Sequence, residues 1–324
     1  MFSIIIPLYN KSKYILRTIE SVFQQSFQDW EIIVIDDGST DDGYQKVSNL
    51  NSEKITLLQK ENSGVSATRN LGISKARFPY IAFLDADDFW HPDYLLSMKI
   101  GIEIFPNAGI WASSFSKDPD ELKISDRPFE IIKNYFQIAI KNNFFFTSSV
   151  VMDKKFFKKN TGFNTNLKRG EDLDIWYRAI CVFGALAFCP DKLVFYERGD
   201  LQGATRTTSP LKASILSIIL NGDYIKPNMV SPSQKEEFDA FRDKYVYYHL
   251  YKYLHNPENN KTIEETLSRI KSKIPMIDLA YRMPSSLQIW VLKSKRGNRL
   301  INKYINYWLE KSIKTNKFKL NINF

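Results

Sequence analysis

Ile81-Ala82-Phe83-Leu84-Asp85-Ala86-Asp87-Asp88 is an apolar run that leads directly into three closely spaced acids. Such a run is typical of a buried strand that delivers polar side chains at its carboxyl end. Clustered carboxylates repel one another unless a cation lies among them, and Mg²⁺ or Mn²⁺ commonly shares such oxygen ligands with phosphates. The other interpretation is a solvated turn before a helix at Pro92, with Asp87 or Asp88 as its cap. This stretch alone leaves both interpretations open.

Upstream of this stretch, strand-like apolar runs alternate with segments of helical periodicity. We expect strands at residues 2–6, 31–35 and 55–58, and helices at 13–25 and, after a turn at 62–64, through residue 76. Strands joined by helices form a parallel sheet covered on both faces, and ligands bind beyond the carboxyl ends of its strands. Together with the strand that precedes Asp85, four strands are expected, and the ends of three of them carry polar groups that should share one crevice: Tyr9 and Asn10, Asp36 and Asp37, and Asp85 and Asp87.

The remainder of the chain predicts further α/β structure and then helices alone. The expected elements are helices at 94–105, 128–140 and 171–183, strands at 109–114, 146–152 and 193–196, and polar loops at 116–128, 164–170 and 199–209. We therefore predict an α/β domain at residues 1–205, divided into parts 1–115 and 116–205. A helical C-terminal region follows at 206–324.

The composition supports a packed, folded protein. The chain has 324 residues, of which 44% are apolar and 14% aromatic, and this excludes general disorder. Cys181 and Cys189 match no metal-ligand spacing and are expected to be buried thiols in a reducing compartment. The apolar run from Phe2 follows no basic segment, and no run approaches about 18 apolar residues. We therefore expect neither a signal peptide nor a membrane span, and a cytoplasmic location.

The positive charge is concentrated in the C-terminal region. Residues 206–324 carry 21 Lys/Arg against 10 Asp/Glu, whereas residues 1–205 carry 24 against 26. A basic helix at 299–314 has an apolar stripe of Leu300, Ile301, Tyr304, Ile305 and Trp308. This helix could lie peripherally on an anionic membrane surface, or pack its stripe on the rest of the protein. No recognisable nucleic-acid-binding motif is present, so we expect no nucleic-acid partner.

Four segments resemble the motifs of family 2 glycosyltransferases, in the family's order and spacing. They are Ile6-Pro7-Leu8-Tyr9-Asn10, residues 34–41, residues 62–70 and Asp85-Ala86-Asp87-Asp88, and the resemblance covers about residues 2–200. It implies a GT-A nucleotide-binding fold with a mostly parallel sheet flanked by helices. It also implies inverting, metal-dependent transfer of a hexosyl or N-acetylhexosaminyl group from a nucleotide donor, UDP above all. The acceptor would be a glycan or lipid-linked glycan in bacterial polysaccharide, capsule or lipopolysaccharide assembly.

The resemblance also implies a base pocket beside the first strand. Pro7, Tyr9 and Asn10 match its positions, and an aromatic face such as that of Tyr9 can stack on a uracil-like ring. Asp37 matches the acid that accepts a hydrogen bond from the base or ribose, since a carboxylate is an acceptor only. The alternative for Tyr9 is a purely structural role, in which its side chain covers the first helix.

Asp36 and Arg69 have more than one possible role. Asp36 could hold its own loop or pair with Arg69. Arg69 could contact the base or pyrophosphate of the donor, or only lock the acidic loops together.

Residues 85–87 match the family's Asp-x-Asp motif. The resemblance makes Asp87 the ligand of Mn²⁺ or Mg²⁺, and directs Asp85 and the intervening Ala86 towards the nucleotide. A bound divalent ion neutralises charge on the departing nucleoside diphosphate.

Glu171-Asp172 matches the acid pair that carries the family's catalytic base. Inverting transfer needs one carboxylate to take the acceptor proton on the face opposite the leaving group. Asp172 is our candidate for this base, and Glu171 would position it. The alternative is helix capping, since acids in a first turn favour the helix dipole, and Asp174 would serve equally well.

The chain departs from the pattern of many GT-A enzymes at one metal ligand. Residues 194–209 contain no His, and His91 more simply packs at a helix start. The ion would then depend on Asp87, phosphates and water. Arg198 and Arg206, after the last expected strand, are candidates for a lid over the diphosphate.

Two other classes remain as alternatives. A nucleotidyltransferase that makes sugar nucleotides would carry a glycine-rich, basic phosphate loop after the first strand, and residues 7–10 do not supply one. A non-catalytic nucleotide-sugar-binding subunit would be expected to lose Asp87 or Asp172, and both are present.

Overall fold

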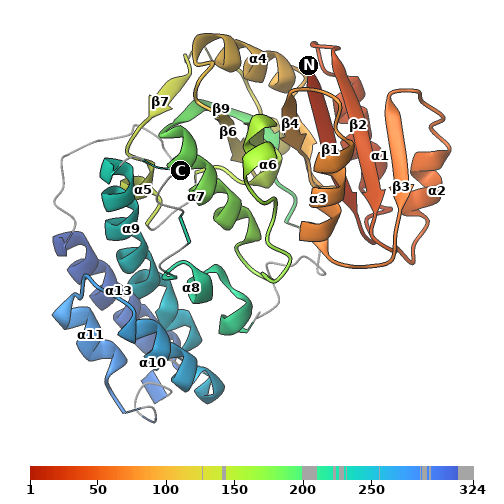
Figure 1. The fold of residues 1–324 in the computed structure, drawn as a ribbon. Helices are drawn as coiled ribbons and strands as arrows, with labels where there is room; N and C mark the ends of the chain where they lie inside the picture. Colours follow the sequence, from red (N-terminus) through yellow and green to blue (C-terminus); the bar gives the residue numbers. More distant parts are fainter. Residues whose placement is uncertain are drawn as a thin grey trace. The chain divides into compact units, whose positions relative to one another are not determined.

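The apolar runs of the first half form strands of one sheet in the computed structural model (Figure 1). The structure describes residues 1–125, 127–140, 144–198, 210–221, 224–225, 230, 232–254, 256–284, 286, 290–291 and 293–312. Clustering of contacts divides the chain into two units. Unit 1 comprises Met1–Tyr135, Phe144–Asn166 and Glu171–Thr207, and unit 2 comprises Phe136–Asn143, Leu167–Gly170 and Thr208–Phe324. Unit 2 therefore takes two short segments from within the first 205 residues.

Unit 1 is built on a sheet that contains nine strands within the described residues, in the order β3-β2-β1-β4-β8-β6-β9-β5, with β7 also paired to β9. The strands are β1 (Phe2–Leu8), β2 (Trp30–Asp36), β3 (Ile55–Gln59), β4 (Tyr80–Phe83), β5 (Phe89–Trp90), β6 (Ile110–Ser116), β7 (Glu130–Ile132), β8 (Val150–Asp153) and β9 (Leu186–Phe195). The first four strands pair in parallel. Strand β8 runs antiparallel to β4 and β6, and β6 is parallel to β9. The predicted mostly parallel α/β sheet is confirmed.

Helices cover both faces of the parallel strands. The helices of this part of the chain are α1 (Ile15–Phe23), α2 (Gly43–Ser48), α3 (Val65–Lys75), α4 (Tyr94–Ile104), α5 (Tyr135–Ile138), α6 (Lys155–Lys159) and α7 (Glu171–Phe183), of which α5 falls mostly in unit 2. Ile4 and Ile6 of β1 join one buried cluster with Ile19 of α1. On the opposite face α3 lies so close that a Cβ at Gly72 would come within 2.5 Å of Ile5. Burial on both faces explains why these strands are continuous apolar runs.

The structure corrects three of the expected elements. The helix expected at 128–140 is instead β7 followed by the short α5. The strand expected at 146–152 begins only at Val150, because Thr147–Ser149 form a 3-10 turn. Strand β9 starts at Leu186 rather than at residue 193, and the two-residue β5 was not expected.

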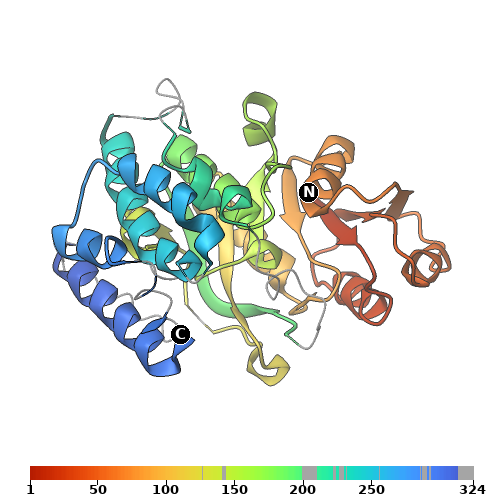
Figure 2. The ribbon, with the colours of Figure 1, turned by 90° about the horizontal axis from the view of Figure 1, so that it is seen from below.

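Unit 2 consists of helices within the described residues (Figure 2). They are α8 (Ile215–Ile218), α9 (Pro232–Leu250), α10 (Asn260–Ser268), α11 (Pro275–Tyr281) and α13 (Lys295–Ser312), with short 3-10 turns between them. Helix α13 packs against α9 and α11. Among the residues that the structure describes, no helix has the length and apolar character needed to span a lipid bilayer.

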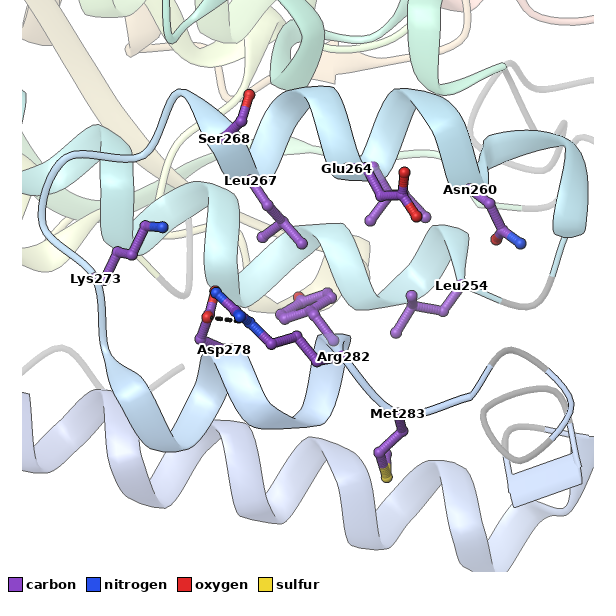
Figure 3. Close-up of a pocket in the computed structure, with 11 residues that line it drawn as sticks. Leu254, Asn260, Glu264, Leu267, Ser268, Lys273, Asp278, Arg282 and Met283 are labelled. Carbon is purple, nitrogen blue, oxygen red and sulfur yellow. Dashed lines mark hydrogen bonds and ion pairs between the residues drawn. The ribbon is translucent and has the colours of Figure 1, made fainter.

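A pocket of about 470 Å³ lies between α10 and α11 of unit 2 (Figure 3). Leu254 and Leu267 line it together with Glu264, and Arg282 pairs with Asp278 on its wall at 2.6 Å. None of the site residues expected from the sequence is among its lining residues. This pocket is therefore not the site that the sequence predicts.

Candidate functional site

Three neighbouring strands, β2, β1 and β4, carry the residues expected to bind a nucleotide, apart from Arg69 on α3 (Figure 1). Pro7 lies within β1, and the other residues follow the carboxyl ends of the three strands. Tyr9 follows β1 and is 47% exposed, so its ring is open to a ligand. Asn10 has a φ of 51° and ties this loop to the next one. Its side-chain oxygen accepts from the backbone amide of Thr40 at 2.8 Å, and its own amide donates to the Ser39 hydroxyl. The backbone beside Tyr9 is thereby held in place.

Asp37 lies directly after β2 and is buried. Its two oxygens accept hydrogen bonds from the backbone amides of Ser63 and Gly64, each at 2.9 Å. Lys60, the residue after β3, also donates to Asp37. The carboxylate thus organises the turn that precedes α3.

Asp36 is fully buried and serves its own loop. Its Oδ2 accepts from the Ser39 amide at 3.2 Å and from the Gln59 amide group at 3.1 Å. Asp36 therefore holds its own loop and does not pair with Arg69.

Arg69 of α3 connects two groups of acids. Its Nη2 lies 2.7 Å from Asp85 Oδ1 and its Nη1 lies 3.5 Å from Glu171 Oε1. The guanidinium also lies over the Phe163 ring, 5.2 Å from its centroid. Burial acts to lower the pKa of Arg69, but Asp85 and Glu171 outweigh it and the pKa is raised. The fixed cation therefore links the end of β4 to the start of α7, which is the locking role left open by the sequence.

Asp87 forms an ion pair with Lys11, which lies in the loop after β1. The Nζ–Oδ2 distance is 2.5 Å, and each side chain is 18% exposed. Burial raises the pKa of Asp87 and Lys11 opposes that rise. Arg17 donates to the backbone carbonyl of Asp87 at 2.7 Å. Two cations of the chain thus face this acid or its backbone.

Asp88 is buried and acts as an anchor. Its carboxylate accepts from the Ser148 hydroxyl at 2.5 Å and from the Glu197 amide at 2.9 Å. Burial, followed by the charges of Asp85 and Asp87, raises the pKa of Asp88 well above its usual value. This acid joins the β4 turn to the segment after β9.

Glu171 and Asp172 open helix α7. Asp172 is partly buried, and its Oδ1 accepts from the Leu173 amide at 2.8 Å. Burial, and after it the charge of Glu171, raises the pKa of Asp172 to about 7. A carboxyl group that titrates near neutrality is suited to exchanging a proton with a substrate.

Asp174, the alternative helix-start acid, has a different task. It pairs with Arg178 at 2.8 Å, and Arg178 also donates to the carbonyls of Thr161 and Gly162. Asp174 therefore holds the preceding loop and is 2% exposed.

Sequence reasoning did not single out Lys11, Lys60 or Ser148, although each contacts a site acid. Lys11 and Lys60 lie just after strands β1 and β3. This position in the sequence is the one signal that could have identified them. Of the two lid candidates, Arg198 is exposed at the end of the segment after β9, and Arg206 lies outside the described residues. His91 packs at a helix start, as expected: its Nδ1 accepts from the Asp93 amide at 3.2 Å.

This fold is the GT-A fold. The structure of S. aureus TarS residues 1–349 in complex with UDP-GlcNAc matches with a TM-score of 0.64 and 16% identity, over 96% of this chain and 91% of that chain. A mannosyltransferase of Pyrobaculum calidifontis in complex with GDP-Man and Mn²⁺ matches with a TM-score of 0.55 and 14% identity, over 97% and 87%.

Residues 3–161 match the sequence model of glycosyl transferase family 2, so the chain carries a glycosyltransferase domain of that family. An uncharacterized glycosyltransferase of Rickettsia bellii is 35% identical over 179 residues, which are 54% of this chain and 25% of that protein. The succinoglycan biosynthesis protein ExoW of Rhizobium meliloti is 29% identical over 205 residues, 56% of this chain and 64% of that protein. The chain spans only about a quarter of the length of the first curated relatives that it matches.

Proposed function

We propose that this protein transfers a sugar from a nucleotide donor, UDP-linked, to a hydroxyl of a glycan or lipid-linked glycan in polysaccharide assembly. The observation that carries the proposal is the link through Arg69 between Asp85, at the expected donor site, and Glu171, beside the expected base. The UDP-GlcNAc complex of TarS supports the donor class, and the succinoglycan role in ExoW's name supports the process. In this proposal residues 1–115 bind the donor, and residues 116–205 carry the base and bind the acceptor.

The donor's base is proposed to lie against Tyr9, whose exposed ring offers a stacking surface. Asn10 holds the backbone that follows Tyr9, and Pro7 lies two residues before Tyr9 within β1. Oδ1 of Asp37 already accepts from Ser63 and Lys60, whereas Oδ2 accepts from the Gly64 amide and can take a second hydrogen bond, so this acid can hold the Ser63–Gly64 turn and still accept from a ring N–H. Arg69, with the ion pairs that it already makes, contributes to the nucleotide site by orienting Asp85. Ala86 lies between the two acids of the motif and is buried.

The acids of the site fit a divalent ion that is shared with the donor. Among the described residues no group of three or more His, Cys, Asp or Glu side chains could hold a metal by itself. Mg²⁺ commonly binds through one or two carboxylates together with substrate phosphates, and Asp87, with Asp85 nearby, supplies that donor set. A bound ion would neutralise charge on the departing diphosphate. The Mn²⁺ in the Pyrobaculum mannosyltransferase complex supports this choice.

Asp172 is proposed to be the catalytic base. As the acceptor oxygen forms its bond to the anomeric carbon, the hydroxyl proton passes to the Asp172 carboxylate. The bond from that carbon to the diphosphate oxygen breaks, and its electron pair leaves with the nucleoside diphosphate. Attack opposite the leaving group inverts the anomeric centre. Glu171, held by Arg69, orients the base and the acceptor.

Helix α13 supports a peripheral membrane contact as a further part of the proposal. Part of the expected stripe packs within unit 2, since Ile301 and Ile305 are buried, and Leu309 is buried beside them. However, Leu300 is 66% exposed and Tyr307 is 51% exposed on the outer side. Basic side chains accompany them on this outer face: Arg296, Arg299, Lys303 and Lys311. Apolar side chains among cations suit an anionic lipid surface, where each nearby Lys or Arg contributes on the order of 1 kcal/mol.

The function is tested by incubating the purified chain with Mn²⁺ and a panel of UDP- and GDP-sugars, and measuring donor binding by thermal shift and nucleotide release. We expect stabilisation by UDP with Mn²⁺ and release of UDP from one UDP-sugar. Asp87→Asn should abolish both. A chain that binds a nucleotide sugar but never consumes it would instead be a binding subunit, and formation of a sugar nucleotide from its phosphate precursors would indicate a nucleotidyltransferase.

A further inference from the structure

The ammonium of Lys11 contacts Asp87, the acid that is proposed to bind the divalent ion. Its Nζ lies 2.5 Å from Asp87 Oδ2. Lys11 follows Asn10, whose amide donates to the Ser39 hydroxyl and whose side-chain oxygen accepts from the Thr40 amide. The loop is thus held at Asn10, while the Lys11 ammonium lies at the end of a flexible four-carbon stem.

We propose that Lys11 is a positioning residue that neutralises Asp87 before the donor binds and transfers its contact to the donor's diphosphate when the donor enters with its metal ion. The inference rests on the proposed function. A carboxylate oxygen that pairs with an ammonium is a weaker partner for a second cation, because the two cations compete and repel. The diphosphate supplies a new anionic partner for the displaced ammonium.

Two buried groups at this end of the sheet differ from the Lys11–Asp87 pair in their exposure. Arg69 is only 4% exposed in its side chain, and it bridges Asp85 and Glu171 at once. Asp88 is 1% exposed and anchored to Ser148 and the Glu197 amide. By contrast, both members of the Lys11–Asp87 pair are 18% exposed. Opening the Lys11–Asp87 pair leaves each charge partly accessible to solvent or ligand, whereas removing the partners of Arg69 or Asp88 would leave a polar group buried and unpaired.

Two consequences follow for binding. Without nucleotide, Mn²⁺ must displace Lys11 and should bind weakly. With nucleotide, Lys11 gains the diphosphate as a partner, so Mn²⁺ and UDP should each strengthen the binding of the other. Removing the ammonium should therefore favour Mn²⁺ alone and disfavour UDP with Mn²⁺.

The test measures Mn²⁺ binding by electron paramagnetic resonance, and UDP binding in saturating Mn²⁺ by calorimetry, for wild type and Lys11→Met. Lys13→Met is the matched control, because Lys13 lies two residues away and contacts the Tyr14 ring. Lys11→Arg keeps the charge and shows whether Lys11→Met effects come from charge or from misfolding. We expect Lys11→Met to bind Mn²⁺ alone about three- to tenfold more tightly and UDP with Mn²⁺ about tenfold more weakly. Lys13→Met and Lys11→Arg should stay within about twofold of wild type.

Unchanged Mn²⁺ affinity in Lys11→Met, or weaker Mn²⁺ binding without nucleotide, would overturn the inference, because Lys11 would then be a static support. If wild type binds UDP with Mn²⁺ while Lys11→Met does not differ from it, only this inference fails. If wild type binds no nucleotide with Mn²⁺, the proposed function fails and the inference fails with it.

Discussion

The Arg69 guanidinium lies 2.7 Å from the Asp85 carboxylate. This ion pair connects helix α3, which carries Arg69, to the end of strand β4, which Asp85 follows. The same guanidinium reaches Glu171 at the start of α7. These acids lie far apart in sequence and carry like charges, so a buried cation between them holds the two segments together. This relationship gives the expected donor and base regions one shared support.

Arg69→Ala should destabilise the fold by about 2–4 kcal/mol, because it leaves Asp85 and Glu171 without their common cation. The effect is kept below that of a fully buried pair by the 30% exposure of the Asp85 side chain. Urea unfolding followed by circular dichroism measures it. The matched control is Lys99→Ala, which removes a more exposed helix pair with Glu103 and should cost less than about 1 kcal/mol. Equal midpoints for the two variants would show that Arg69 does not support the site.

Tyr9→Ala should weaken UDP binding by about 1–3 kcal/mol without changing the unfolding temperature, since stacking on a base is lost from an exposed ring. Tyr9→Phe keeps the stacking face and should bind UDP as wild type does. Calorimetry in Mn²⁺ gives the affinities. Loss of affinity in Tyr9→Phe, or none in Tyr9→Ala, would argue against the stacked base.

The rate of sugar transfer should rise with pH through about 7, where Asp172 titrates. The sign follows from the role: a base must be deprotonated, so kcat/KM falls about tenfold per pH unit below its pKa and levels off above it. Initial rates between about pH 5.5 and 8.5 measure the profile. A transfer rate that does not change across this pH range would show that Asp172 does not accept the proton.

Leu300→Ser combined with Tyr307→Ser should reduce co-sedimentation with vesicles that contain anionic lipid, because the outer face of α13 loses its apolar contacts. Raising the salt concentration should weaken binding of wild type as well. Lys158→Glu with Lys159→Glu on α6 of unit 1 is the control for a change of charge outside α13 and should leave binding unchanged. Unchanged co-sedimentation of the α13 variant, or co-sedimentation that does not depend on lipid charge, would contradict the membrane contact.

The sequence predicted the parallel part of the sheet well, because those strands are buried on both faces and read as apolar runs. It failed where tertiary pairing decides structure. The segment at 130–132 has helix-like periodicity but adds to the edge of β9 as three residues of strand. Strand β9 contains Pro190, a residue that normally marks a strand end, and the register of its partner β6 shifts between Ser113 and Phe115.

The site was predictable only in part, for similar reasons. Acids at the ends of apolar runs identify Asp37, Asp85 and Asp87, since parallel strands bring their carboxyl ends to one edge. Which cation faces which acid depends on the path of loops and helices, so the pairing of Lys11 with Asp87 had no signal of its own. Lysine after a strand is common on any surface.

The most direct test of the account is transfer by Asp172→Asn, with donor binding measured on the same sample. We expect UDP affinity in Mn²⁺ within about twofold of wild type and transfer slowed by at least about 100-fold, since general base catalysis contributes about 10²–10⁴-fold. Asp174→Asn, which disturbs the Arg178 pair on the same helix turn, controls for loss of the helix start and should retain transfer in the folded fraction. Transfer by Asp172→Asn within about tenfold of wild type would contradict the assignment of Asp172 as the base.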